Sequence, residues 1–567
     1  MEGSDPFDGD EDAALRYAIA LSLQDAEQDK PIELSSDDDS DDLDKAPITT
    51  PAMGGLAALD RKKMEEERLA RQGKRKAPDS EQDTQGDRQR LKTGPLPTIE
   101  RLGMTSKANP TLANPNSQGL PFPRGVVKKT WAYGYPRTGD DIKIEEVLQK
   151  NELELAVISS FQWDEEWMLS KIDIKKTKIV CIAFASSKQQ QDEMTENVPK
   201  GSAIRFCFPP MLPYGNMHSK LQILKYPKYL RLVVPSGNLV SYDWGETGVM
   251  ENIVFIIDLP RIEDPKAREE NQLTMFGDDL LYFLEAQGLQ EGLVNSLKNY
   301  DFSETSRYSF VHSIGKTHTG DSWKRTGYCG LGRAVTALGL GTQEDVEIDL
   351  VTSSLGSVNK DLVAAIYYAA KGDDGMKEYG ERTTKTGKGK AEKPSASTIW
   401  AGYRDRLRLY FPSQDTVAKS RGGTQSAGTI CAQSKWWDAA TFPRELVHDC
   451  KSVRDGLLMH NKIMLVRLRQ AGKGPPAWGY VGSANLSESA WGRLTRDRQT
   501  GKPKLTCRNW ECGVIIPTAD GGQTATGKGD SSVGMSVFLG SIPIPMVVPG
   551  ETYGQTGSKR PWLFLEN

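Results

Sequence analysis

The chain has 567 residues, and its 72 Lys and Arg against 76 Asp and Glu give a formal net charge of −4. This length exceeds one usual domain and favours two compact units, or one duplicated unit with tails. No apolar run is long enough to predict a membrane-spanning helix. The near-neutral charge hides an asymmetry, because residues 1–45 carry 16 acidic and three basic side chains, which leaves a net +9 on the remainder. The chain outside residues 1–45 therefore suits a polyanionic partner such as DNA.

Cysteine and histidine usage narrows the chemistry. Seven cysteines without a Cys-x-x-Cys pair predict reduced thiols in a cytosolic or nuclear protein. The five histidines are His218, His312, His318, His448 and His460. Zinc sites need closely spaced Cys and His ligands, and the sequence has no such cluster, so the expected chemistry needs neither metal nor cofactor.

Residues 1–124 are predicted to form a disordered regulatory tail, since acidic, basic and Pro/Asn/Gly-rich stretches alternate there with little apolar periodicity. Segment 11–25 is an exception, because Leu15, Ile19 and Ser22 recur at i, i+4 and i+7 on one helical face. The pattern fits an amphipathic helix that docks on the rest of the chain. With its preceding acidic residues it also resembles the ubiquitin-interacting motif, which implies ubiquitin as a partner.

Two further tail segments carry interaction signals. Segment 31–42 sets Ile32 and Leu34 beside a run of acids, which is either a solvated charge run or resembles a SUMO-interacting motif that adds a strand to its partner. Candidate phosphorylation sites among these acids are Ser35, Ser36 and Ser40. Segment 61–76 contains two basic clusters, typical of a bipartite nuclear import signal or of a solvated charge run. The first interpretation predicts a nuclear protein.

From about residue 125 the composition becomes globular, and strand-length apolar runs mix with helical patterns. The clearest strands are Ile179–Phe184, Leu230–Val234 and Ile253–Leu259, and the clearest helix is Asp278–Gln287. This mixture predicts an α/β fold. Residues 371–398 are rich in Gly, Lys and Thr and are predicted to be a mobile insertion, and 518–531 another loop.

An internal repeat is the most informative feature of the sequence. Residues 217–224 match residues 459–466, each with His-x-Lys followed by an apolar strand. Ser-x-Asn-Leu follows both units, at 236–239 and 483–486, and a Trp follows each in turn. Alternation along a strand sets each His and Lys on the same face. The repeat therefore predicts a duplicated strand pair and two similar lobes, 125–345 and 346–567, related by a pseudo-two-fold axis.

Two histidines, two lysines and two asparagines suit phosphoryl transfer if the lobes meet. Lysines and amides donate hydrogen bonds to phosphate oxygens and stabilise the charge of a pentavalent state. One imidazole can attack phosphorus, while the other protonates the leaving oxygen and later removes a proton from water. The repeated residues are His218, Lys220, Asn238, His460, Lys462 and Asn485.

The paired pattern resembles the phospholipase D superfamily, whose lipid-cleaving members carry Asp five residues after the Lys. Lys225 and Arg467 occupy those positions here. This departure is shared with the tyrosyl-DNA phosphodiesterase family, which the chain resembles over about three quarters of its length. Supporting stretches are 211–215, 352–357, 410–413, 482–492 and 560–562. The resemblance implies an α/β fold of two similar lobes, with mixed sheets flanked by helices in a phospholipase D-like duplication.

The resemblance also implies residue roles. His218 is similar to the nucleophile that forms a phosphohistidine with the DNA 3′ end, and His460 to the acid that protonates the departing tyrosyl oxygen and then activates water. Lys220, Lys462, Asn238 and Asn485 match the phosphate-binding set. Glu511 matches the acid that orients a catalytic imidazole, because a carboxylate on one ring nitrogen fixes the tautomer.

The carboxylate partner of the other histidine is less determined. The family often has Gln about a dozen residues after the first Asn, yet no Gln lies between Asn238 and Pro260. The internal repeat offers Glu251, which precedes a strand as Glu511 does, and the rival is Glu246. Both could instead be solvated, and Glu251 is the expected partner.

Substrate contacts follow from the resemblance with weaker support. Ser353 and Ser354 are expected to donate to the DNA backbone, or to cap the helix predicted at 361–370. Phe161 and Trp163 are expected to stack on a base or to pack in the core, and Tyr214 has the same ambiguity. Ser426, after Gly422 and Gly423, is expected on the peptide side of the substrate. Candidate phosphate contacts, or solvated surface charges, are Lys419, Arg421, Lys451 and Arg454.

Together with the composition, the resemblance implies a monomeric nuclear DNA-repair phosphodiesterase, active on single-stranded or frayed DNA 3′ ends that carry tyrosine or a topoisomerase I peptide. Related 3′ adducts are expected substrates too, since attack on phosphorus places limited demands on the leaving group. Two alternatives remain open. One is another phospholipase D-superfamily nuclease, and the other is a ubiquitin- or SUMO-reading scaffold with an inactive enzyme body.

Overall fold

The protein is described here by a computed structural model. The structure describes residues 119–383, 402, 404–470, 475–518, 533–553 and 559–564. The expectations for segments 11–25, 31–42 and 61–76 lie outside these residues, as do most of the two predicted loops. The beginning of the first loop is helical, since α11 spans Met376–Thr383, so the expectation of a loop is wrong for that part.

A mixed eight-stranded sheet occupies the first half of the described chain. Its strands, in spatial order, are β2 (Asp141–Ile142), β1 (Val126–Thr130), β9 (Ile253–Pro260), β7 (Tyr229–Pro235), β6 (Gln222–Lys225), β3 (Leu155–Ser159), β4 (Lys178–Ile182) and β5 (Ile204–Cys207). Strands β7 and β9 are buried along their whole length. Near-continuous apolar runs of this kind are typical of strands that are covered on both faces.

A seven-stranded sheet occupies the second half. Its order is β10 (Ser309–Ser313), β22 (Glu511–Pro517), β19 (Ala477–Gly482), β18 (Ile463–Leu468), β12 (Val346–Val351), β14 (Leu407–Phe411) and β16 (Val447–Asp449). The order and the strand directions repeat those of the first sheet from β1 to β5. The two-lobed α/β duplication expected from the repeat is therefore confirmed.

The helices cover both sheets. They are α3 (Ile144–Leu148), α4 (Glu165–Ser170), α6 (Pro265–Glu270), α7 (Met275–Ala286), α8 (Glu291–Ser296), α9 (Gly327–Ala337), α10 (Lys360–Ala370), α13 (Gln414–Ala418), α14 (Ser434–Trp437) and α15 (Glu488–Trp491). Helices α3 and α4 pack on one face of the first sheet, while α7 packs on the other. The predicted helix at 278–287 corresponds to α7 and begins three residues too late.

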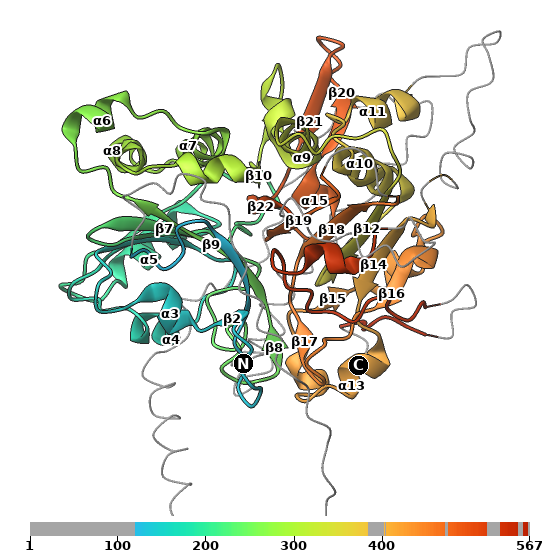
Figure 1. Ribbon diagram of the computed structural model, residues 1–567, viewed down its shortest axis with the longest axis horizontal. Helices are drawn as coiled ribbons and strands as arrows, with labels where there is room; N and C mark the ends of the chain where they lie inside the picture. Colours follow the sequence, from blue (N-terminus) through green and yellow to red (C-terminus); the bar gives the residue numbers. More distant parts are fainter. Residues whose placement is uncertain are drawn as a thin grey trace, which may run out of the picture. The chain divides into compact units, whose positions relative to one another are not determined.

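Three small sheets complete the described fold, and one of them connects the halves. They are β11 (Thr317–His318), β20 (Arg493–Arg496) and β21 (Pro503–Thr506), then β13 (Ser354–Leu355) with β15 (Cys431–Ala432), and β8 (Met250–Glu251) with β17 (Leu458–Met459). Strands β8 and β17 come from different halves and pair in parallel. Strand β19 contacts both β7 and β9, and β22 contacts β7, so the two sheets face each other through a shared core (Figure 1).

The domain boundaries remain predictions, although the sheets bear on one of them. Strand β10 already belongs to the second sheet, so the sheets change over between Pro260 and Ser309, upstream of the predicted boundary at 345/346. Helix α5 (Lys188–Glu196), capped by Ser187, belongs to a separate compact unit. None of the helices in the described part of the chain is long and apolar enough to cross a membrane.

Candidate active site

The two His-x-Lys units lie immediately before equivalent strands. His218 and Lys220 precede β6, and His460 and Lys462 precede β18. All four side chains are buried, with at most 5% of each residue exposed. Each lysine Nζ donates to the backbone carbonyl of its own histidine, at 2.9 Å in the first unit and 2.8 Å in the second. The charges of both lysines act on both imidazoles, so the two units form one electrostatic site.

His218 is held by a carboxylate from the other half of the chain. Its Nδ1 lies 2.9 Å from Glu511 Oε2, as the resemblance implies. Burial opposes ionisation of Glu511, but the charges of His218 and Lys220 and the hydrogen bonds that it accepts lower its pKa. Burial, helped by Lys220 and Lys462, lowers the pKa of His218 to about 4 against the opposing charge of Glu511. His218 is therefore neutral near pH 7, with Nδ1–H donated to Glu511 and an Nε2 lone pair available for attack.

The partner of His460 is Asp243, which sequence reasoning missed. His460 Nδ1 lies 3.2 Å from Asp243 Oδ2, which also accepts the backbone N–H of Asn238 at 2.6 Å. Burial, helped by Lys462 and Lys220, lowers the pKa of His460 to about 4 against the charge of Asp243. Although burial opposes it, the pKa of Asp243 is lowered by His460 and by these hydrogen bonds.

Glu251 and Glu246 are both wrong as partners of the His460 ring. The Glu251 carboxylate binds Arg454 and the Ser452 hydroxyl. Glu246 accepts from Trp167 Nε1 at 2.9 Å and pairs with Lys171 Nζ at 2.6 Å.

Glu251 and Glu511 both precede a strand, but the structure shows that the two repeats correspond through a serine hydroxyl instead. In the second half, Glu511 accepts from the Ser483 hydroxyl, and that hydroxyl accepts the N–H of the next residue, Cys512. In the first half, Asn252 accepts from the Ser236 hydroxyl at 2.8 Å, and the hydroxyl accepts the N–H of Ile253. The counterpart of Glu511 is therefore Asn252, one residue after Glu251. Asn252 Nδ2 donates to Asp243 Oδ1 at 3.0 Å, so the amide supports a carboxylate instead of replacing it.

Both asparagines of the repeat are fixed through their carbonyl oxygens. Asn485 Oδ1 accepts the Thr352 hydroxyl, the Ser353 hydroxyl and two backbone N–H groups of the 353–354 loop at 3.1–3.2 Å. Asn238 Oδ1 accepts the backbone N–H of Gln162 at 3.3 Å. These bonds orient each amide, which leaves the Asn485 Nδ2 group to donate to an anion.

The Ser353–Ser354 loop supports Asn485 and does not cap the following helix. Ser353 is fully buried and its hydroxyl is used by Asn485. The cap of α10 is Asn359, whose side chain accepts from Leu362 N at 2.9 Å. The expectation of a Ser353 or Ser354 cap is therefore wrong, while a DNA contact through Ser354, which is partly exposed, stays a prediction.

The predicted aromatic contacts differ in their surroundings. The Phe161 ring centroid lies 5.3 Å from that of His218, and Lys220 Nζ lies 6.0 Å from the Phe161 centroid. Trp163 is half-buried and its backbone bridges to Leu239. Tyr214 is 70% exposed and has a φ of 64°, a conformation that costs a non-glycine residue free energy. An exposed ring in a strained backbone just before His218 suits substrate contact better than core packing.

The predicted basic contacts are mostly paired. Lys419 pairs with Asp415, Lys451 with Asp449 and Arg454 with Glu251. Arg421 donates to the carbonyl of Tyr133 at 2.7 Å. The Arg454 side chain is 11% exposed and is bound to Glu251, and its contact with a substrate phosphate stays a prediction. Ser426 ends a 3₁₀ turn, Thr424–Ser426, and is partly exposed.

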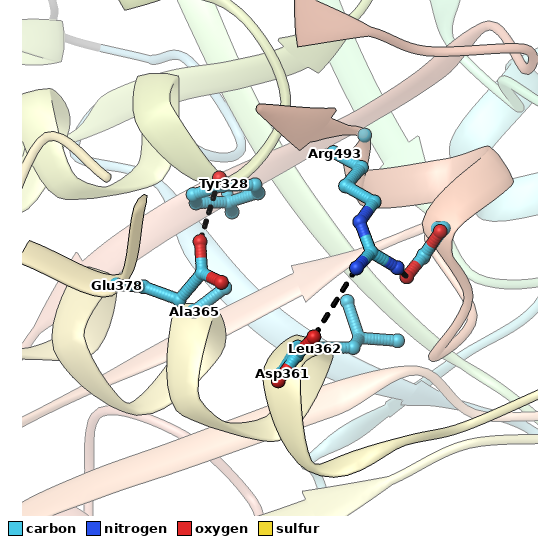
Figure 2. A pocket seen from close by; sticks show the side chains of 8 residues that line it. Tyr328, Asp361, Leu362, Ala365, Glu378 and Arg493 are labelled. Carbon is cyan, nitrogen blue, oxygen red and sulfur yellow. Dashed lines mark hydrogen bonds and ion pairs between the residues drawn. The ribbon is translucent and has the colours of Figure 1, made fainter. Parts of the chain in front are cut away.

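A small pocket elsewhere in the second half is lined by polar side chains that are hydrogen-bonded to one another. Arg493 donates to Asp361 at 3.2 Å and to Glu488 at 2.8 Å, and Tyr328 donates to Glu378 at 3.5 Å (Figure 2). None of the repeated His, Lys or Asn residues lines it. Among the described residues no three His, Cys, Asp or Glu side chains are grouped as metal ligands.

The duplicated sheets, with His and Lys before equivalent strands and carboxylates exchanged between halves, define a phosphodiesterase of the phospholipase D type. The family model described as tyrosyl-DNA phosphodiesterase matches residues 126–554. The chain belongs to the tyrosyl-DNA phosphodiesterase family.

Individual relatives are distant in sequence. The chain is 22% identical to tyrosyl-DNA phosphodiesterase 1 of Drosophila melanogaster, over 73% of this chain and 68% of that protein. It is 23% identical to tyrosyl-DNA phosphodiesterase 1 of Arabidopsis thaliana, over 66% of this chain and 58% of that protein. The crystal structure of the yeast tyrosyl-DNA phosphodiesterase superposes with a TM-score of 0.52 at 16% identity, covering 77% of this chain and all of that one. This structural likeness confirms the fold.

Proposed function

We propose that the protein hydrolyses the phosphodiester bond between a DNA 3′ end and a tyrosine, as left by trapped topoisomerase I, together with related 3′ adducts. One observation carries the proposal: two buried imidazoles each contact a carboxylate from the opposite half, beside two buried lysines. Membership of the tyrosyl-DNA phosphodiesterase family supports the substrate class.

In the first step, His218 Nε2 attacks phosphorus and the bond between phosphorus and the tyrosyl oxygen breaks. His460 donates its Nε2 proton to the leaving phenolate oxygen. The products are a phosphohistidine on the DNA 3′ end and free tyrosine or peptide. The 2.9 Å contact between His218 Nδ1 and Glu511 supports the nucleophilic assignment, since it fixes the tautomer that exposes Nε2.

In the second step, His460, now neutral, takes a proton from water as the water oxygen attacks phosphorus. The bond between phosphorus and His218 breaks, which releases a DNA 3′ phosphate and the free imidazole. The same residue thus serves as acid and then as base, as microscopic reversibility suggests for two similar displacements. Asp243 stabilises the imidazolium form that the first step requires.

Substrate binding itself supplies the protonated form of His460. In the empty site, burial and the two lysines keep the pKa of His460 near 4, and burial and Lys220 lower the pKa of Lys462 well below its usual range. A bound phosphodiester adds a negative charge beside these groups and raises their pKa values. The acid is thereby charged when a phosphate is present to use it, and the lysines and asparagine amides stabilise the pentavalent state.

Substrate selection is proposed to involve the residues around this centre. Tyr214 offers an exposed ring for an unpaired base, and such stacking tolerates any sequence. Phe161 packs against the nucleophilic imidazole and limits its rotation. Ser354 is proposed to donate to the DNA backbone, and Ser426 to lie on the peptide side.

The tail is proposed to recruit and localise the enzyme. Segment 11–25 would bind ubiquitin, 31–42 would bind SUMO, and 61–76 would direct nuclear import. The acidic composition of residues 1–45 supports a protein-binding role. Titration of labelled ubiquitin against the full chain and a form lacking residues 1–45 tests the first of these, and equal binding by both forms would discard it.

Turnover of a 3′-phosphotyrosyl oligonucleotide in the presence of EDTA tests the reaction and its independence of metal together. The expected products are tyrosine and a 3′-phosphate oligonucleotide, at the same rate with and without EDTA. Hydrolysis of liposomes or cleavage of unmodified DNA would instead favour another activity of the phospholipase D superfamily. Full activity of a His218→Ala protein would contradict the proposal.

A further inference from the structure

Glu251 lies where the backbone of His460 is fixed to the opposite half. The His460 N–H donates to the Glu251 carbonyl at 3.0 Å, and the Leu458 N–H donates to the Val249 carbonyl at 2.9 Å. These bonds join β17 to β8 in parallel, with Met459 opposite Glu251. The main chain that carries the general acid is therefore attached to a two-residue strand of the other half.

The Glu251 side chain fixes the loop that leads to the same histidine. Its carboxylate, fully buried, accepts Arg454 Nε at 2.9 Å, a second nitrogen of the same guanidinium, and the Ser452 hydroxyl. Arg454 also donates to the Thr130 carbonyl at 3.0 Å. Residues 452–460 are thus held at both ends by one glutamate, through its side chain and then through its carbonyl.

The opposite histidine has no ionic counterpart to this arrangement among its described contacts. The His218 N–H donates to the Trp510 carbonyl at 3.1 Å, and the Trp510 N–H donates to the Asn216 carbonyl at 2.9 Å. Trp510 is fully buried, and its indole donates to the Pro210 carbonyl at 3.0 Å. A packed indole holds one histidine, whereas a buried ion pair holds the other.

We propose that Glu251 and Arg454 are positioning residues that set the place of His460 against the phosphorus, an assignment that rests on the proposed function. A buried ion pair adds little net stability compared with apolar side chains of the same shape. Its bidentate geometry does fix direction and distance. A misplacement of about 1 Å is sufficient to cost about 10²-fold in rate.

The proposal predicts which steps depend on the pair. His460 protonates the tyrosyl oxygen in the first step and activates water in the second, whereas His218 attacks phosphorus in the first. Loss of the pair should therefore slow phenolate departure and adduct hydrolysis, and leave the attack itself intact. A substrate whose leaving group needs no proton separates these steps.

The experiment compares single turnover of two oligonucleotides, one with a 3′-phosphotyrosine and one with a 3′-(4-nitrophenyl) phosphate, on the parent chain and on Arg454→Met. We expect adduct formation to fall about 10- to 100-fold with the tyrosyl substrate and by less than about 3-fold with the nitrophenyl substrate. Adduct hydrolysis should slow by the larger factor with both, so the covalent adduct accumulates. The double variant Glu251→Gln/Arg454→Met removes both charges and leaves no unpaired carboxylate. It should show the same difference between the two substrates and the same slowing of adduct hydrolysis.

Arg231→Met is the matched control, because it breaks a fully buried Arg–Asp pair, Arg231 with Asp258, inside the first sheet. It should lower thermal stability but leave the ratio between the two substrates unchanged. Equal slowing of both substrates without adduct accumulation would overturn the positioning role, and so would parent-like kinetics of the double variant. A parent chain that cleaves neither substrate would instead contradict the proposed function.

Discussion

The two halves of the described chain share a strand order but hold their histidines differently. In the second half, Glu511 lies on β22 and binds His218 directly. In the first half, the equivalent position on the chain is Asn252, and the carboxylate comes from Asp243 in the turn before it. Duplication therefore preserved the ring–carboxylate contact while changing the residue that supplies it. The contact is what the chemistry requires, since either carboxylate can fix the tautomer of the opposite ring.

The largest expected effect separates the two histidines. His218→Ala should lower turnover by about 10⁴-fold or more, because no nucleophile remains. His460→Arg should retain the attack but hydrolyse the adduct slowly, so a covalent protein–DNA species accumulates. Denaturing gels with a labelled 3′-phosphotyrosyl oligonucleotide measure this species. Slowed turnover by His460→Arg without an adduct would contradict the roles assigned to the two histidines.

The next effect concerns the two carboxylates. Glu511→Gln should slow adduct formation, and Asp243→Asn should slow both the departure of the tyrosyl oxygen and adduct hydrolysis. Each effect should be about 10²- to 10⁴-fold, because the amide allows the wrong tautomer. Single-turnover kinetics resolve the two steps. Glu246→Gln is the control, since its carboxylate pairs with Lys171 instead, and it should change either rate by less than about 3-fold. A Glu246→Gln defect equal to that of Asp243→Asn would contradict the pairing.

A smaller effect comes from making the first half resemble the second. Asn252→Asp keeps the shape of the side chain but replaces the amide that donates to Asp243 Oδ1 at 3.0 Å with a second carboxylate. Two carboxylates in contact share one proton, which raises one of their pKa values. The hydrogen-bonded pair then exists below that raised pKa and is lost as the pH rises through it.

Adduct hydrolysis by Asn252→Asp should therefore fall about 10-fold at pH 8 and recover toward the parent rate at lower pH. The pH–rate profile measures this shift, with the parent chain as reference. A profile identical in shape to that of the parent would show that Asn252 does not act through Asp243.

The smallest effect is on stability and concerns the outer strands. His312 on β10 pairs with Cys512 on β22, and Lys129 on β1 pairs with Ile253 on β9. Because β10 and β1 hold equivalent places in the two sheets, His312 is the counterpart of Lys129. The His312 ring is buried among aromatic side chains, and its nitrogens have no hydrogen-bond partner among the described residues. Burial, with smaller contributions from Arg325, His318 and Arg333, lowers its pKa well below 6.5.

The unfolded chain takes up a proton at His312 as the pH falls below about 6.5, whereas the folded chain does not, so stability is lost over that range. His312→Leu should remove this loss. Thermal unfolding at pH 7.5 and pH 5 should show a drop in midpoint that is a few degrees smaller than for the parent. An equal or larger drop would contradict the burial argument.

Much of the fold and most of the site could be predicted from the sequence. The paired His-x-Lys and Ser-x-Asn-Leu motifs identified equivalent strands, because a period of two puts both side chains of each unit on one face. Glu511 was found through the resemblance. The sequence did not reveal Asp243, because an acid before a strand is a misleading guide to how the two repeats correspond. The geometry that the two halves share centres on the Ser236 and Ser483 hydroxyls.

The sequence by itself determined the α/β duplication, the division of charge between acidic residues 1–45 and a basic remainder, and the six side chains of the two repeats. Only the tertiary structure decided which carboxylate meets which imidazole, and that Glu251 binds Arg454 rather than a catalytic ring. The physical reason is sequence distance: His218 meets Glu511 across 293 positions and His460 meets Asp243 across 217. Contacts of that range depend on how two sheets pack face to face, a property that no local periodicity encodes.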